Sequence, residues 1–125
     1  MKYILTKRAP SAIGPYSQAI LAGNILFVSG QLGMENTNNQ LLSGITLQTE
    51  KALQNLNEII TEAGFSITDI MKTTIFLKDI NSFQEVNSIY SDFFKDHKPA
   101  RSTVEVNALP RSALIEIEAI AIKLS

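Results

Sequence analysis

Two segments of the chain carry apolar residues at the spacing of an amphipathic helix. From Thr46 to Ala63, apolar residues recur three or four positions apart, as they do along one face of a helix. The residues on this face are Ala52, Leu53, Leu56, Ile59, Ile60 and Ala63. Because Gly64 follows directly and glycine commonly ends helices, the pattern predicts a helix over 46–63.

The second helical segment follows Asn81 and Ser82, which offer an N-cap. Its apolar stripe consists of Phe83, Val86, Tyr90, Phe93 and Phe94. Proline does not continue a helix, so Pro99 prevents this segment from extending past Lys98. The spacing predicts a helix that begins after Ser82 and buries its aromatic side chains.

The remaining apolar segments are rich in β-branched and aromatic residues, which are typical of strands. Within 18–29, two such runs flank the turn signal Gly23–Asn24, and together they predict a hairpin. Further strands are predicted over 69–78, 102–106 and 114–124. The stretch from Gly30 to Gly44 is rich in Gly, Asn and Gln without helical periodicity, which predicts a loop with at most a short extra strand.

The order of these elements, ββ-α-β-α-ββ, predicts an α+β sandwich with both helices on one face of a sheet. The last strand has apolar residues on both of its faces. Ile115, Ile117, Ala119 and Ala121 point one way, and Ile120, Ile122 and Leu124 point the other way. Two helices can cover only one face, so we expect the other face to pack against another subunit.

The composition predicts one globular domain over residues 1–125. With 45% hydrophobic and 18% charged residues, intrinsic disorder is excluded. The net charge is −1 and the Lys and Arg residues are scattered, so no surface for nucleic acid or an anionic membrane is expected. No apolar run reaches the roughly 20 residues of a membrane span, and no signal-peptide pattern follows Met1, so a cytoplasmic protein is predicted.

The cysteine and histidine content restricts the chemistry further. The chain has no Cys, which excludes disulfides, thiolate metal sites and a cysteine nucleophile, and His97 is the only histidine. We therefore expect no metal, and we place His97 on the surface in the loop before Pro99. Ser29 follows a strand but lacks the flanking pattern of a nucleophile elbow, so a serine hydrolase is not expected.

Glu116 and Glu118 are the first candidates for chemistry. Two residues apart on a strand, they point the same way, roughly 6.5–7 Å apart. Burying an unpaired carboxylate costs several kcal/mol, so at least one of them should meet a cation, a donor or a water-filled cavity. The alternative is that both lie at a solvated strand end. The spacing also suits a glycosidase pair, but no other residues indicate a sugar cleft.

Arg101 is the second candidate, and it lies at the start of the strand that follows Pro99. A guanidinium in this place can form two parallel hydrogen bonds with a carboxylate or a phosphate. The alternative is an ordinary ion pair on the surface. The residue pattern around Arg101 does not decide between these two interpretations.

Six short motifs follow one another along the whole chain. They are Ala12-Ile13-Gly14-Pro15-Tyr16-Ser17-Gln18, Val28-Ser29-Gly30-Gln31, Lys72-Thr73-Thr74, Val86-Asn87, Pro99-Ala100-Arg101-Ser102 and Ile115-Glu116-Ile117-Glu118-Ala119-Ile120-Ala121. In this order they resemble the Rid (YjgF) family of reactive-intermediate deaminases. The resemblance implies a chorismate-mutase-like α+β fold and a homotrimer whose sheets form a closed central barrel. It also implies active sites in the clefts between subunits.

The resemblance further implies hydrolysis of 2-iminobutanoate and 2-iminopropanoate to 2-ketoacids and ammonia, without a cofactor. The family's carboxylate-binding arginine falls on Arg101, and its water-orienting glutamate falls on Glu116. The positions that match the pocket lining are Tyr16, Ser29, Gly30 and Asn87. Thr103 stands where many active members have Cys. The family's contact there is thought to involve the backbone, so we expect Thr103 to be tolerated in substrate binding.

Two other functions stay open at this point. A regulatory member of such a family can keep the cleft and bind a small metabolite or a partner protein without turnover. The presence of both Arg101 and Glu116 favours hydrolysis, because a carboxylate sensor needs only the arginine. RNA cleavage, ascribed to some relatives, normally uses paired groups such as two histidines together with clustered cations, and the chain has neither.

Overall fold

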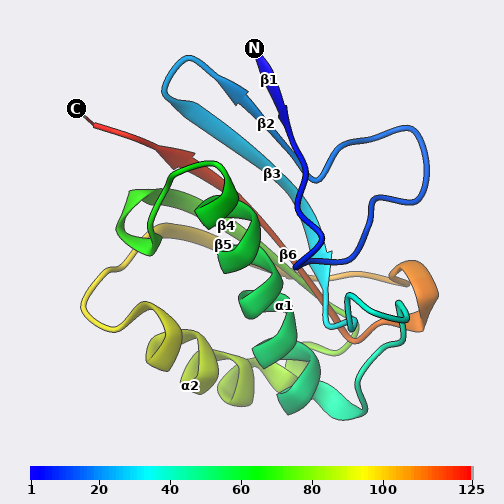
Figure 1. Cartoon of the computed structure of the whole chain (residues 1–125). Helices are drawn as coiled ribbons and strands as arrows, with labels where there is room; N and C mark the ends of the chain where they lie inside the picture. The colour runs from blue at the N-terminus through cyan, green and yellow to red at the C-terminus, as the bar shows by residue number, and fades with distance from the viewer. Residues whose placement is uncertain (125) are drawn as a thin grey trace.

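The computed structural model describes residues 1–124, which form six strands and two α-helices (Figure 1). The strands are β1 (Lys2–Ile4), β2 (Ala19–Ala22), β3 (Ile25–Leu32), β4 (Ile70–Leu77), β5 (Ala100–Glu105) and β6 (Ile115–Ile122), and the helices are α1 (Gly44–Glu62) and α2 (Phe83–Phe94). Short 3₁₀ turns lie at Ile67–Asp69, Ile80–Ser82 and Pro110–Ser112. Every predicted helix and strand is present within a few residues of its expected bounds.

The strands form one mixed sheet in the order β1-β2-β3-β6-β4-β5. All neighbours are antiparallel except β4 and β5, which run parallel. Parallel neighbours cannot be joined by a tight turn, so the chain must cross over the sheet between them. Helix α2 is this crossover, and the connection places it beside the strand that carries Arg101.

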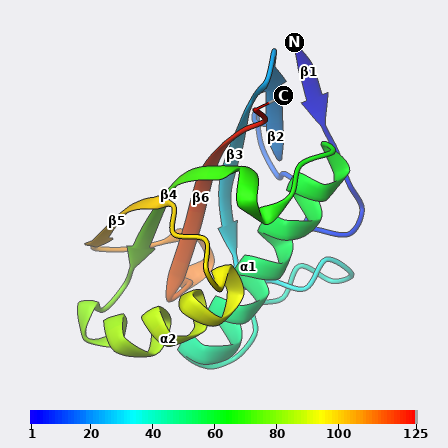
Figure 2. The same cartoon turned by 90° about the vertical axis from the view of Figure 1, so that its left-hand side faces the viewer.

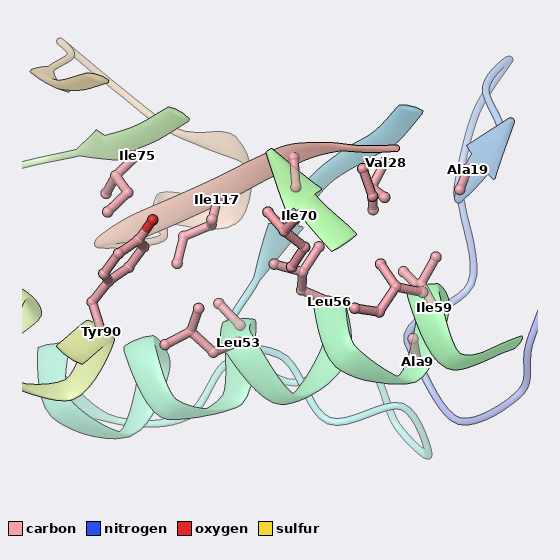
Figure 3. Close-up of a cluster of buried hydrophobic side chains, with 14 of the residues drawn as sticks. Ala9, Ala19, Val28, Leu53, Leu56, Ile59, Ile70, Ile75, Tyr90 and Ile117 are labelled. Atoms are coloured by element: carbon pink, nitrogen blue, oxygen red, sulfur yellow. The ribbon is translucent and has the colours of Figure 1, made fainter. Parts of the chain in front are cut away.

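Both helices lie on the same face of the sheet, as the order of elements predicted (Figure 2). Helix α1 packs over β3 and β6 and against α2. Figure 3 shows Leu53, Leu56 and Ile59 of α1 beneath Ile70 of β4 and Ile117 of β6, and all five side chains are buried. Full burial of a Leu or Ile side chain contributes about 1.5–3 kcal/mol, so this cluster holds the two layers together.

Three details differ from the prediction. Strand β1 was not predicted because three residues are too few to show alternation, and it forms by pairing with β2. Strand β3 continues to Leu32, beyond the expected start of the loop, whereas the isolated bridge between Met34 and Leu41 agrees with the short extra strand that the prediction allowed. Ser82 occupies the N-cap position of α2, but its side chain makes no capping hydrogen bond.

The face of the sheet away from the helices carries apolar side chains in one row. Tyr3, Ile20, Phe27 and Ile120 are successive cross-strand neighbours on β1, β2, β3 and β6. Tyr3 is 64% exposed and Phe27 is 48% exposed. The prediction that both faces are apolar is confirmed, and within residues 1–124 no helix covers this second face (Figure 2).

Candidate active site

Arg101 is the second residue of β5, and its side chain points toward α2. The guanidinium carbon lies 4.8 Å from the ring centre of Tyr90 and 5.5 Å from that of Phe83. These two rings are seven residues apart, so they lie on one face of α2, and Asn87 lies between them on that face. A cation over an aromatic ring gains about 0.5–2 kcal/mol. The aromatic stripe of α2 therefore supports the arginine.

A hollow of about 480 Å³ opens beside this arginine, and we call it the Arg101 hollow. Its lining includes Asn87, Tyr90, Phe94, Pro99 and Arg101. Arg101 is half-buried, and within residues 1–124 it makes no ion pair. A permanently charged guanidinium with no carboxylate partner is suited to bind an anionic ligand.

Glu116 lies on β6, on the face away from the helices, and its carboxylate lies over Gly30 of β3. A Cβ atom on Gly30 would lie 2.0 Å from Glu116 Oε2, so only glycine leaves room for the carboxylate. With Tyr16, Ser29 and Pro110, these residues line a second hollow of about 270 Å³, the Glu116 hollow. In the part of the chain described, Glu116 makes no ion pair.

A β-bulge shapes β3 beside this carboxylate. Val28 pairs with Ala119, and Gln31 pairs with Ile117, so β3 has one residue more than β6 across this span. The irregularity falls on the Ser29–Gly30 dipeptide, which the sequence placed at the end of a strand. Bulges redirect side chains and bend the strand that carries them. This one brings the two dipeptide residues to the wall of the Glu116 hollow.

Ser29 and Gln18 hold the N-terminal wall of the Glu116 hollow. The Ser29 hydroxyl donates to the Ser17 carbonyl at 2.6 Å, and the Ser29 amide donates to the Gln18 carbonyl at 2.9 Å. The buried Gln18 side chain donates to the carbonyls of Thr6 and Pro10 at 3.0 and 2.9 Å. Sequence reasoning did not single out Gln18 as a site residue, because a glutamine that binds backbone carbonyls has no signal of its own.

The environment of Glu116 favours its protonated form. Burial raises the pKa of the Glu116 carboxyl above its usual range, and the negative charge of Glu118 raises it further. A carboxylate with a raised pKa is a stronger proton acceptor, which suits a general base. Glu118 shares the strand face, as the spacing predicted, but it is exposed. The alternative that both glutamates lie at a solvated strand end does not hold, because Glu116 is half-buried and Glu118, although exposed, lies in the middle of β6.

The predicted site residues form two groups that a single chain keeps apart. One group is Tyr16, Ser29, Gly30 and Glu116, and the other is Asn87 and Arg101. Arg101 is opposite Thr73 of β4, and Thr73 is opposite Ala119 of β6. Glu116 is three residues further along β6, so the backbones of Arg101 and Glu116 are roughly 10 Å apart across the sheet and about another 10 Å apart along the strands. The two residues also face opposite sides of the sheet. The chain alone does not bring them into one site.

Thr103 and His97 complete the set of residues that the sequence analysis considered. Thr103 follows Arg101 by two residues on β5 and so faces α2, and its hydroxyl is buried without a hydrogen-bond partner among residues 1–124. His97 lies in the loop before Pro99, as predicted, but not fully on the surface. His97 is half-buried because its ring Nε2 donates to the Ile70 carbonyl at 2.6 Å, which ties the loop after α2 to β4.

Each hollow offers few groups to a metal or cofactor. The Glu116 hollow contains one carboxylate, and the Arg101 hollow contains one imidazole, that of His97. Within residues 1–124 no three His, Asp or Glu side chains come together closely enough to hold a metal ion. No helix in the described part of the chain is both long and apolar enough to cross a membrane.

Comparisons with known proteins agree with the motifs. Residues 6–123 match the family model described as endoribonuclease L-PSP. A RutC family protein of Sulfurisphaera tokodaii is 48% identical over 98% of this chain and 99% of its own length. The 2-iminobutanoate/2-iminopropanoate deaminase of Homo sapiens is 47% identical over 98% of this chain and 90% of its own length. The solved structure of E. coli TdcF with bound serine has a TM-score of 0.96 at 39% identity, and the match covers 99% of this chain and 100% of that one. The chain therefore belongs to the Rid (YjgF) family, to which the endoribonuclease L-PSP model corresponds.

Proposed function

We propose that the protein hydrolyses the 2-imino acids 2-iminobutanoate and 2-iminopropanoate to 2-ketoacids and ammonia, without a cofactor. The names of relatives support this substrate class in part. The human relative is named as a deaminase of these two compounds, and E. coli TdcF holds serine, an amino acid of similar size that also has a carboxylate. The Sulfurisphaera relative carries only a family name. The proposal therefore depends on the chemistry of the two hollows.

Arg101 is the observation that carries the proposal. A 2-imino acid is a small carboxylate next to a C=N bond. The guanidinium is half-buried, supported by two aromatic rings and free of an ion pair within residues 1–124. It can donate two parallel hydrogen bonds to the carboxylate, which fixes the position of the imine carbon.

Glu116 supplies the proton transfer. Its carboxylate accepts a proton from water as the water oxygen bonds to the imine carbon, and the nitrogen takes up a proton in turn. A second transfer, from the new hydroxyl through the carboxyl group to nitrogen, lets the carbon–nitrogen bond break and ammonia leave. Positioning and one proton relay suffice, because imine hydrolysis is already fast without a catalyst.

The complete site lies between neighbouring chains of a homotrimer. One chain provides Arg101 and the next provides Glu116, because these residues face opposite sides of the sheet within one chain. The row of Tyr3, Phe27 and Ile120 gives each sheet an apolar surface that another sheet can cover, as in the chorismate-mutase-like barrel that the family resemblance implies.

A coupled assay tests the activity. A pyridoxal-phosphate dehydratase generates 2-iminobutanoate or 2-iminopropanoate, and the disappearance of the imine is followed with and without the protein. Faster loss than in buffer is the expected result. A rate equal to that of buffer with both imines would reject hydrolysis and would leave carboxylate binding without turnover, for which Arg101 alone is sufficient.

A further inference from the structure

Tyr90 of α2 makes two contacts that connect Arg101 to the interior of the molecule. Its hydroxyl lies 2.6 Å from Oγ1 of Thr73, a fully buried residue of β4. Its ring centre lies 4.8 Å from the guanidinium carbon of Arg101. Figure 3 shows the Tyr90 side chain rising from α2 toward the sheet, with its hydroxyl oxygen at the end nearest the strands. The ring therefore has one anchored end and one face close to the cation.

These contacts close a loop through three elements. Arg101 and Thr73 are register partners on β5 and β4, Thr73 is hydrogen-bonded to Tyr90, and Tyr90 supports Arg101. The tyrosine ring cannot move away without leaving a buried hydroxyl unpaired, which costs about 1–3 kcal/mol. The arginine side chain, in contrast, carries about 2 kcal/mol of rotamer entropy and makes no ion pair within residues 1–124 that would restrain it.

We infer that Tyr90 is a positioning residue for Arg101. Its anchored ring keeps the guanidinium beside the Arg101 hollow before a carboxylate arrives, so that less freedom is lost when the carboxylate binds. The inference rests on the proposed function, which identifies the substrate as a 2-imino acid. It concerns only how Arg101 binds the carboxylate of that substrate. Tyr90 should therefore act on binding, whereas Glu116 acts on turnover.

A purely structural role for Tyr90 would have different consequences. Core packing depends on the ring, which also lies 4.5 Å from the ring of Phe94 and which phenylalanine would preserve. The position of Arg101 depends on the ring and also on the hydroxyl that anchors it. Burial raises the pKa of the Tyr90 hydroxyl, so this hydroxyl stays neutral and hydrogen-bonded to Thr73 at physiological pH.

The test measures binding and turnover in Tyr90→Leu, Tyr90→Phe and Thr73→Val. KM and kcat are measured with 2-iminobutanoate, and Kd is measured by calorimetry with 2-oxobutanoate, the stable ketoacid with the same carboxylate. Tyr90→Leu is expected to raise KM and Kd by about twofold to thirtyfold, the range of a cation–π contact, and to change kcat little. Tyr90→Phe and Thr73→Val should each raise Kd by less than Tyr90→Leu does. The double variant should raise Kd no more than either single variant, because both substitutions remove the same hydrogen bond.

Phe93→Leu is the matched control, because Phe93 lies on the same helix with its ring against Phe94 rather than Arg101. It should keep the wild-type Kd. Unchanged KM and Kd in Tyr90→Leu would overturn the inference, as would a loss of kcat at constant KM. If Tyr90→Leu does not fold, the nearly isosteric variants Tyr90→Phe and Thr73→Val are used instead. Unchanged KM and Kd in these two variants would then overturn the inference.

The ketoacid Kd keeps this test separate from the test of the proposed function. A protein that binds 2-oxobutanoate in an Arg101-dependent way but does not hydrolyse imines would contradict the proposed function alone. The inference about Tyr90 would then be judged by Kd. A wild-type protein that binds no ketoacid at all would overturn the inference.

Discussion

The Arg101 hollow and the Glu116 hollow hold their charged groups by opposite means. Side chains of a crossover helix support the guanidinium: the rings of Phe83 and Tyr90 lie beside it. Backbone features hold the carboxylate: a bulge in β3 and the missing side chain of Gly30. Precise support matters most at a reacting group, where a displacement of about 1 Å can cost roughly 10²-fold in rate. If Arg101 binds the substrate and Glu116 transfers the proton, as proposed, variants of the two hollows should separate binding from turnover.

The largest effect is expected from Glu116→Gln, which keeps the shape of the side chain and removes the proton acceptor. Turnover should fall by on the order of 10²- to 10⁴-fold, the usual share of general acid–base catalysis. Substrate binding should change much less because Arg101 supplies it. Steady-state kinetics of this variant and of Glu118→Gln, its neighbour on the same strand face, make the comparison. If Glu118→Gln loses turnover and Glu116→Gln does not, the catalytic role belongs to Glu118 and not to Glu116.

Thermal unfolding checks that Glu116→Gln is folded. Because the pKa of Glu116 is raised in the folded protein, the charged carboxylate reduces stability at pH values above the pKa of the unfolded chain. The loss is complete above the folded pKa, and it disappears as the pH falls from there to the pKa of the unfolded chain. Glutamine carries no charge, so the variant should unfold at the same or a higher temperature than the wild type at neutral pH.

Mixing two inactive variants tests whether the two regions belong to different chains. Glu116→Gln keeps a working arginine, and Arg101→Met keeps a working glutamate. If each site combines two neighbouring chains, every mixed trimer has one working site of three, so isolated mixed trimers should recover about one third of the wild-type activity and the whole random mixture about one quarter. Co-expression with two purification tags isolates the mixed species, and sedimentation should give about three times 13.8 kDa. Mixed species as inactive as the parents, or a stable monomer, would contradict a shared site.

Arg101→Lys tests whether the arginine binds through its two-pronged geometry or only through its charge. Lysine keeps the charge but cannot form two parallel hydrogen bonds. We expect kcat/KM to fall by about 10- to 150-fold, the equivalent of one charge-assisted hydrogen bond. Arg8→Lys is the control, because the Arg8 side chain is 79% exposed, forms its ion pair with Glu58, and lines neither hollow. A fully active Arg101→Lys protein would show that the paired hydrogen bonds are not needed.

The smallest effect is expected in the pH dependence of kcat/KM, which depends on the pKa of Glu116. The charge of Glu118 raises the pKa of Glu116, so Glu118→Gln should lower that pKa. The base must be deprotonated to act, and activity therefore rises as the pH rises through this pKa. The acid limb of the kcat/KM profile should move to lower pH in Glu118→Gln, with the plateau unchanged. If the acid limb does not move in Glu118→Gln, the limb reflects the titration of a group other than Glu116.

Local elements could be predicted because their signals lie within single segments. The periodicity over 46–63 and the turn at Gly23–Asn24 each specify one element without reference to the rest of the chain. Strand β1 could not be predicted, since three residues become a strand only through pairing with β2. The bulge at Ser29–Gly30 was missed for the same reason, because it exists only relative to the register of β6.

The candidate residues could be named from the motifs, but their arrangement could not. Whether Arg101 and Glu116 share a face depends on the registers of β4 with β5 and with β6, which are long-range pairings. Tyr90 was visible only as one apolar position in a helical stripe. Its contact with Arg101 follows from the parallel crossover that places α2 beside β5, and no local pattern contains that information.

The contact between Gly30 and Glu116 has a consequence for how such chains diverge over time. Gly30 does not have a positive φ, so what this position requires is space for the carboxylate rather than an unusual backbone conformation. One requirement for glycine at position 30 therefore disappears when position 116 loses its acid. Lineages that have lost the glutamate should accumulate larger residues at position 30. An alignment can thus separate members that retain the proton acceptor from those that keep only the fold.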